Sequence, residues 1–265
     1  MTEITLDQTE PVKLYVVEQG QGQPLVFIHG WAASHRFWKH QISYFTSHNH
    51  VFAYDLRGHG DSAKPERGYH VEAHVDDLKI LLTTYQISSP VLVGHSLGGM
   101  IALQYALQQP TRLQALVLVG TSPRPIDSRK RSIQFSFLRF MIRLSRNRAS
   151  KFTEKELFGP DVDPELVEWV NAESLRTPTH VILEILQDVK KFNITSRLSD
   201  IKIPTLFISG EFDSATTPNS ATQMQQLLPQ AQIQLVKGAG HNCMLEEPSK
   251  FNTILHSFLS ELRSQ

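Results

Sequence analysis

The stretch VLVGHSLGG (Val91–Gly99) decides how the rest of the chain is interpreted. An apolar, β-rich run leads into a Gly-x-Ser-x-Gly centre, and an apolar run rich in Ala and Gln, typical of a helix, follows over 100–109. A strand, a tight turn and a helix in this order are the context that a nucleophile elbow needs. We therefore expect Ser96 at an exposed, strained turn, where Gly94 and Gly98 let strand and helix approach closely.

Length and composition describe an ordinary globular chain. Its 265 residues suffice for one large α/β domain with an insertion or for two small domains. A formal net charge of zero gives no global field that would indicate a nucleic-acid binder. We expect no signal peptide and no transmembrane segment, because the N-terminus lacks a basic and an apolar region and no apolar run reaches about 20 residues. The single cysteine, Cys243, favours a cytoplasmic location.

Strand-like and helix-like runs alternate along much of the chain, which implies a mostly parallel sheet covered by helices on both faces. Apolar runs predict strands at 12–18, 25–28, 51–54, 90–93, 113–119, 203–210 and 233–236. From Gly120 to about 200 the pattern is helical instead. We expect one α/β core made of 1–121 and 200–265, with a helical cap inserted at 122–199.

Charge is unevenly distributed within this expected cap. Residues 121–151 hold nine of the 26 basic side chains but one of the 26 acidic ones, Asp127. Arg139, Arg143 and Arg146 recur at helical spacing and would form one stripe of a helix. The pattern fits a solvated helix face, and membrane-surface association is a weaker alternative.

A serine hydroxyl is a poor nucleophile at neutral pH, so Ser96 needs a base, and the base needs an orienting group. In open parallel sheets the reacting groups collect at the carboxyl ends of strands. Asp213 follows the strand that ends at Gly210, and His241 follows the strand that ends at Val236. We therefore predict Ser96 as nucleophile, His241 as base and Asp213 as the group that orients His241.

Neighbouring residues offer alternatives to these assignments. Glu211 is a second carboxylate in the same loop, but Asp213 sits deeper in it. The chain has twelve histidines, and the Gly-flanked loop after the last strand favours His241 among them. His95 adjoins the serine but should point away from it across the turn, so we reject it as the base. Cys243 is expected to be a buried bystander.

Two backbone N–H groups are expected to hold an oxyanion. Leu97 provides one, because it follows the serine at the start of a helix, where free N–H groups and the helix dipole favour negative charge. Trp31 provides the other, in the His29–Trp31 loop after an earlier strand, and its indole would line the pocket. The sequence contains no phosphate loop, dinucleotide-binding motif or metal-ligand cluster.

Taken together, these pieces resemble the α/β-hydrolase superfamily. The matching segments span nearly the whole chain in the family's order: His29–Trp31, Asp55–Ser62, Gly94–Gly99, Gly210–Pro218 and Gly240–His241. The resemblance implies an eight-stranded, mostly parallel sheet, a helical cap after strand six and no cofactor or metal. Within the superfamily the pattern resembles the small bacterial esterases, lactonases and C–C hydrolases. Ser96 argues against haloalkane dehalogenases and epoxide hydrolases, which have Asp at that position.

The His29–Trp31 segment and the basic stretch also resemble the pimeloyl-acyl-carrier-protein methyl ester esterases. In that family, arginines of the cap receive an acidic acyl-carrier protein. By this resemblance Arg139, Arg143 and Arg146 would be a docking site. The chain departs from the family at His95, where Trp can occur, and at Ala32.

We predict a serine hydrolase that cleaves a small-molecule carboxylic ester through an acyl-enzyme on Ser96. The same triad could act on an acyl-carrier-protein methyl ester, open a lactone, hydrolyse a C–C bond or form a peracid. A small-ligand receptor without turnover is the alternative from another class, because a fold does not determine function.

Overall fold

The computed structural model describes residues 2–5, 12–123, 137, 139–145, 157–216 and 218–264. Its centre is one eight-stranded sheet in the order β1-β2-β4-β3-β5-β6-β7-β8. The strands are β1 (Thr2–Thr5), β2 (Lys13–Gln19), β3 (Pro24–Ile28), β4 (His50–Tyr54), β5 (Val91–His95), β6 (Ala115–Val119), β7 (Thr205–Gly210) and β8 (Gln232–Val236). From β4 to β8 every neighbouring pair is parallel, whereas β2 runs antiparallel to both of its neighbours.

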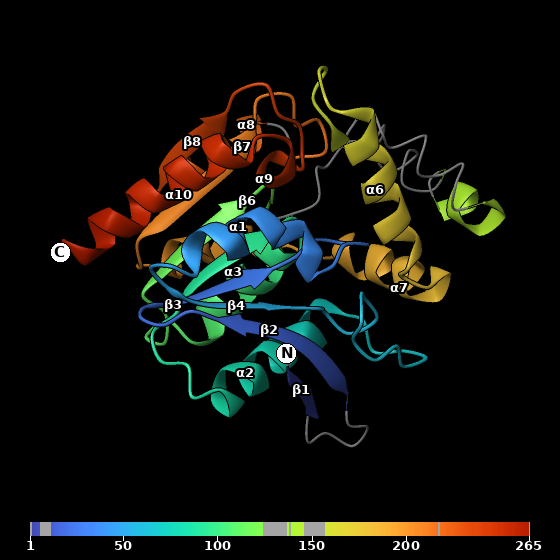
Figure 1. Ribbon diagram of the computed structural model, residues 1–265, viewed down its shortest axis with the longest axis horizontal. Helices are drawn as coiled ribbons and strands as arrows, with labels where there is room; N and C mark the ends of the chain where they lie inside the picture. The colour runs from blue at the N-terminus through green and yellow to red at the C-terminus, as the bar shows by residue number, and fades with distance from the viewer. Residues whose placement is uncertain are drawn as a thin grey trace.

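Helices cover both faces of this sheet (Figure 1). One face packs against α2 and α3, and the opposite face packs against α1 and α10. The helical elements are η1 (His35–Trp38), α1 (Lys39–Phe45), α2 (Val71–Thr84), α3 (Leu97–Gln108), α6 (Pro164–Leu175), α7 (Thr179–Val189), η2 (Thr195–Asp200), α8 (Pro218–Leu227), α9 (Cys243–Glu246) and α10 (Pro248–Arg263). Because both faces are covered, the central strands β5 and β6 are buried at every position, as continuous apolar strands should be.

The predicted fold class is confirmed, with local corrections. The apolar pattern predicts seven strands and misses β1, whose four residues TEIT form no recognisable run and pair only with the edge of β2. Such pairing is a contact between distant residues that local sequence does not encode. The predicted strands at 113–119 and 203–210 each begin two residues later, at Ala115 and Thr205.

Between β6 and β7 the described residues are helical, as expected, and include α6, α7 and η2. In Figure 1, α6 and α7 lie to one side of the sheet, on the right. Hydrogen bonds tie α7 to the sheet domain: the Glu184 carboxylate accepts from the N–H groups of Gly68 and Tyr69, and Asp188 accepts from Val71 N–H. The division into a core at 1–121 and 200–265 and a cap at 122–199 stays a prediction. In the part of the chain that the structure describes, no helix has the length and apolar character to cross a membrane.

Three fully buried histidines are neighbours, with His59 of the loop after β4 between His29 and His74. The ring centroids of His29 and His59 are 5.2 Å apart, and those of His59 and His74 are 6.5 Å apart. Burial lowers the pKa of His29 to about 4 and that of His59 to about 3, and burial lowers the pKa of His74 well below its usual value. All three are therefore neutral in the folded protein near pH 7.

This row of histidines predicts a loss of stability in acid. In the unfolded chain each imidazole binds a proton below about pH 6.5, but in the folded chain it does not until the pH reaches its lowered pKa. Unfolding free energy should therefore fall by about 1.4 kcal/mol per pH unit for each histidine as the pH drops below 6.5. Urea unfolding of wild type and His74→Leu between pH 7.5 and 5 measures this, and the variant should show a shallower slope. His48→Gln, at an exposed position, is the control. An equal slope in His74→Leu and His48→Gln would contradict the account.

Candidate active site

Ser96 lies at a strained turn between β5 and α3. Its backbone dihedrals, φ 51° and ψ −112°, are ones that residues with a side chain rarely adopt. Two hydrogen bonds hold the turn: Ser96 N–H donates to the carbonyl of Val119 at 2.8 Å, and the Thr121 hydroxyl donates to the carbonyl of Ser96 at 2.8 Å. The residues at the end of β6 therefore support the turn on which the serine side chain stands.

The two glycines that flank this turn are required by close backbone contacts. A Cβ on Gly94 would lie 2.4 Å from the carbonyl oxygen of Gly98, and a Cβ on Gly98 would lie 2.2 Å from the carbonyl oxygen of Ile28. No side chain fits at either distance. The start of α3 can therefore lie directly against β5 and β3, which brings Ser96 next to the loop that follows β3.

His241 and Asp213 are in direct contact at the ends of β8 and β7. The Nδ1 atom of His241 lies 2.9 Å from Asp213 Oδ2, and both side chains are buried. Asp213 also accepts hydrogen bonds from the backbone N–H and the hydroxyl of Thr216, both at 2.8 Å. Because a carboxylate can only accept, His241 donates its Nδ1 hydrogen to Asp213 and keeps Nε2 available as a base.

The interactions within the His241–Asp213 pair favour the ionised form of Asp213. Burial by itself would raise the pKa of Asp213, but the adjacent His241 and the hydrogen bonds from His241 and Thr216 outweigh burial and lower it. Burial would lower the pKa of His241, but the charge and hydrogen bond of Asp213, with a smaller contribution from Glu246, raise it. The imidazole is thus made a stronger proton acceptor while Asp213 stays charged.

Glycines bring these three side chains to one edge of the sheet. A Cβ on Gly120, after β6, would lie 3.0 Å from His241 Nδ1 and 3.1 Å from Asp213 Oδ2, and a Cβ on Gly30, after β3, would lie 3.3 Å from the Cβ of Ser96. Within the described residues the Ser96 hydroxyl forms no hydrogen bond to His241, a looser geometry that is common before substrate binds.

His95 has a supporting function that the sequence did not indicate. Its Nε2 lies 3.0 Å from the carbonyl oxygen of His241, so Nε2 carries the hydrogen and donates it. Burial lowers the pKa of His95 to about 3, which keeps the ring neutral. The residue before the serine therefore holds the backbone of His241 and, as expected, is not placed as a base.

The two expected oxyanion donors are Leu97, which directly follows Ser96, and Trp31, which directly follows Gly30 in the loop next to Ser96. Leu97 is the first residue of α3, so its N–H has no partner within the helix. Trp31 follows Gly30, whose carbonyl oxygen accepts from Ala33 N–H at 3.3 Å and from His29 Nδ1 at 2.8 Å. His29 thus holds the loop that carries Trp31.

Glu173 of α6 also anchors this loop, and sequence analysis did not single it out. Its buried carboxylate accepts from the Ser34 hydroxyl at 2.8 Å and pairs with Arg36 at 3.0 Å. Nearby, His35, Asp55 and Asp61 bring three possible metal-ligand atoms within 4.8 Å of one another. Asp55, however, already accepts from the backbone N–H and the ring of His35 at 2.6 and 2.8 Å, so the cluster is accounted for by hydrogen bonds within the protein.

The described part of the basic stretch packs beside the Trp31 loop. Ile142 is buried against Ile182 of α7, with Trp31 and Ala32 of the loop packed against the pair. Arg143 is exposed and Arg139 is partly exposed on the same short segment. Arg146 lies outside the described residues.

Comparison with known proteins identifies the family of this chain. The sequence profile of the alpha/beta hydrolase fold matches residues 23–248. The chain belongs to the alpha/beta hydrolase family. This hydrolase is 27% identical to the AB hydrolase superfamily protein YisY of Bacillus subtilis (strain 168), over 94% of its own length and 96% of that protein.

Two further similarities concern esterases. The hydrolase is 28% identical to the pimeloyl-[acyl-carrier protein] methyl ester esterase of Nitrosomonas europaea, over 90% of its own length and 96% of that enzyme. The solved structure of a thermophilic esterase from Thermogutta terrifontis superposes with a TM-score of 0.91 at 24% identity, covering 99% of both chains. At that identity the superposition establishes the fold alone.

Proposed function

We propose that this hydrolase is a serine carboxylesterase that acts on a small-molecule ester through an acyl-enzyme on Ser96. The observation that carries the proposal is the buried hydrogen bond of 2.9 Å between His241 and Asp213, at the edge of the sheet where Ser96 stands at a strained turn. A nucleophile, a base and an orienting carboxylate are the minimum set for this chemistry.

The proposed reaction has two halves. In the first, His241 Nε2 takes the proton of Ser96, the oxygen attacks the ester carbonyl, and the backbone N–H groups of Leu97 and Trp31 stabilise the oxyanion. The protonated His241, stabilised by Asp213, then gives its proton to the leaving alcohol, and the acyl-enzyme remains. In the second half, His241 activates a water molecule in the same way, and the carboxylic acid and free Ser96 are released.

The surroundings of Trp31 support an apolar acyl group as part of the substrate. Trp31 and Ala32 pack with Ile142 and Ile182, so apolar side chains surround the residue that we propose as the second oxyanion donor. Methyl esters of a longer acyl chain, as in the named activity of the Nitrosomonas europaea relative, fit such a lining. A more specific proposal is that the ester is carried by an acyl-carrier protein, which docks on the cap arginines.

An acyl-chain series, repeated with acyl-carrier-protein methyl esters, tests the role of the basic stretch. If Arg139 and Arg143 receive an acidic carrier, the double variant Arg139→Glu, Arg143→Glu should lose about 10-fold or more in kcat/KM for the carrier-bound ester, and free p-nitrophenyl esters should be unaffected. A variant of an exposed lysine elsewhere, Lys250→Glu, is the control. If both substrate forms react at the same rate and the double variant changes neither rate, these arginines only form a solvated helix face.

Other activities on the same fold make different predictions. Lactone opening, C–C hydrolysis and peracid formation would need the same Ser96 but would show a preference for the corresponding substrate. A receptor without turnover would bind a ligand tightly and leave simple esters intact. The cytoplasmic location expected from the single cysteine stays a prediction, as does the division into core and cap.

A further inference from the structure

The loop that carries His241 is held from behind by a carboxylate outside the proposed triad. Glu246, the last residue of α9, accepts hydrogen bonds through Oε2 from the N–H of Gly240 at 3.0 Å and from the N–H of Gly159 at 2.7 Å. Gly240 is the residue directly before His241. A single oxygen therefore joins the histidine loop to the segment before α6.

That segment and the loop fit closely at the same point. His241 N–H donates to the carbonyl of Leu157 at 3.1 Å, and a Cβ on Gly240 would lie 2.4 Å from the carbonyl carbon of Phe158. Because the two backbones are in contact, residues 157–159 support the backbone position of His241. The hydrogen bond from Gly159 N–H to Glu246 holds the same two segments together at a second point.

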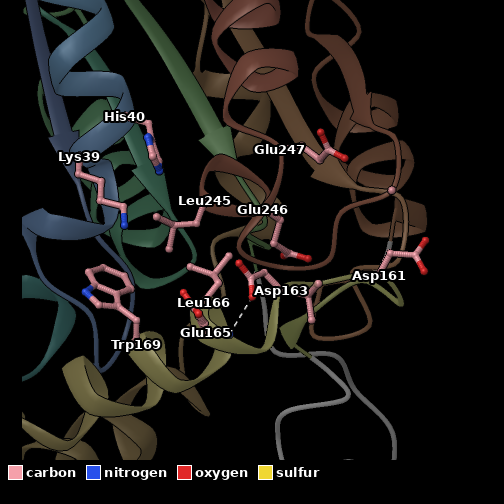
Figure 2. Close-up of a pocket in the computed structure, with 12 residues that line it drawn as sticks. Lys39, His40, Asp161, Asp163, Glu165, Leu166, Trp169, Leu245, Glu246 and Glu247 are labelled. Atoms are coloured by element: carbon pink, nitrogen blue, oxygen red, sulfur yellow. Dashed lines mark hydrogen bonds between the residues drawn. The ribbon is translucent and has the colours of Figure 1, made fainter.

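Glu246 can be reached from outside the active site. It lies on the wall of an open pocket of about 610 Å³ between α1, α6 and residues 238–247, and Figure 2 shows its side chain there with Leu166 and Asp163 nearby. His241 and Ser96 do not line this pocket. Glu246 is thus separate from the substrate side of the histidine and acts on it only through the loop and through its charge.

We propose that Glu246 is a positioning residue for His241: its carboxylate holds the histidine loop against residues 157–159 and keeps the imidazole aligned between Asp213 and Ser96. The inference rests on the proposed function, because it assigns Glu246 a role in positioning His241, the proposed base. Loss of the two hydrogen bonds would leave Gly240 free to move and the imidazole less well aimed, without removing any group that touches substrate.

Charge adds a second effect of the same residue. The carboxylate of Glu246 contributes to the raised pKa of His241, although less than Asp213 does. Burial raises the pKa of Glu246, and the hydrogen bonds from Gly159 and Gly240 oppose that rise. The other charged or titratable groups around the pocket come from three elements: Lys39 and His40 of α1, Asp161, Asp163 and Glu165 at the start of α6, and Glu247 after α9.

Two variants of Glu246 separate alignment from charge. Glu246→Gln keeps an oxygen that can accept the two N–H groups but removes the charge, whereas Glu246→Ala removes both. Glu247→Gln is the matched control, since Glu247 lines the same pocket but pairs with Lys250 at 3.0 Å instead. The measurements are kcat and KM against pH on a p-nitrophenyl ester and the NMR titration of the His241 ring, assigned by the loss of its signal in His241→Gln.

We expect Glu246→Ala to lower kcat by about 10- to 100-fold with KM nearly unchanged, because the alignment and the charge that support His241 are lost while every group proposed to touch substrate remains. In Glu246→Gln most of kcat should return, while the acidic limb of the pH profile and the NMR titration of His241 both move to lower pH. The control should match wild type in every respect. A purely structural role would lower stability without moving the His241 titration.

Wild-type kcat in Glu246→Ala would overturn the proposal, and an unchanged His241 titration in Glu246→Gln would overturn the additional effect of its charge. If Glu246→Ala does not fold, Glu246→Met, which also removes both hydrogen bonds but fills the space of the side chain, takes its place in the same comparison. If the wild-type protein hydrolyses no ester, the proposed function fails, but the NMR titration still tests whether Glu246 acts on His241.

Discussion

Ser96→Ala should lower kcat for p-nitrophenyl ester hydrolysis by about 10⁴-fold or more, since it removes the atom that we propose to form the acyl-enzyme. The expected residual rate is the one that oxyanion donors and binding provide without a nucleophile. KM should change little, because the hydroxyl contributes to the reaction more than to ground-state binding.

The protein should stay folded in this variant. Alanine keeps the Cβ at the strained turn, and the bonds of Ser96 to Val119 and Thr121 use backbone atoms that alanine also has. Thermal unfolding should therefore report a stability within about 1 kcal/mol of wild type. Ser249→Ala, at an exposed position of α10, is the control for serine removal as such. Undiminished hydrolysis in folded Ser96→Ala would show that another group performs the reaction.

Asp213→Asn is the second large effect, expected to lower kcat by about 10⁴-fold near neutral pH. The asparagine amide would still reach His241 Nδ1 but would donate to it, which moves the ring hydrogen to Nε2. An imidazole with hydrogen on Nε2 cannot accept the proton of Ser96. The loss of charge also removes the main cause of the raised pKa of His241, so the residual activity should extend to lower pH.

Glu211→Gln is the matched control for this substitution, two residues away in the same loop. Glu211 accepts from Gly238 N–H at 3.0 Å in an exposed position and does not contact His241. Its variant should keep kcat within about threefold of wild type, as surface changes outside a site usually do. If Glu211→Gln were the inactive variant and Asp213→Asn the active one, the orienting carboxylate would be Glu211.

Much of the fold follows from local sequence, because a strand that is buried on both faces has a continuous run of apolar residues. β5, β6 and β7 are of this kind, and the Gly-x-Ser-x-Gly turn lies where the pattern puts it. β1 was missed because its stability comes from pairing with β2 and not from its own four residues. The helical nature of the segment between β6 and β7 was predicted, but its anchoring through Glu173 and Glu184 was not.

The candidate site divides in the same way. Asp213 and His241 could be found because each follows a strand whose end is readable. The supporting contacts of His95 and Glu246 could not be predicted, since they join residues far apart in the chain or depend on how the His241 loop folds back. A side chain that supports another through a backbone carbonyl or N–H leaves no spacing pattern in the sequence.

The most direct test of the central claim is to identify which atom reacts. Wild-type protein treated with a fluorophosphonate and digested for mass spectrometry should carry one adduct, on the peptide that contains Ser96, and ester turnover should fall in proportion to labelling. Ser96→Ala should take up no label, and Asp213→Asn should take it up far more slowly. An adduct on any other residue, or full ester turnover in protein whose Ser96 is fully labelled, would contradict the assignment of Ser96 as the nucleophile.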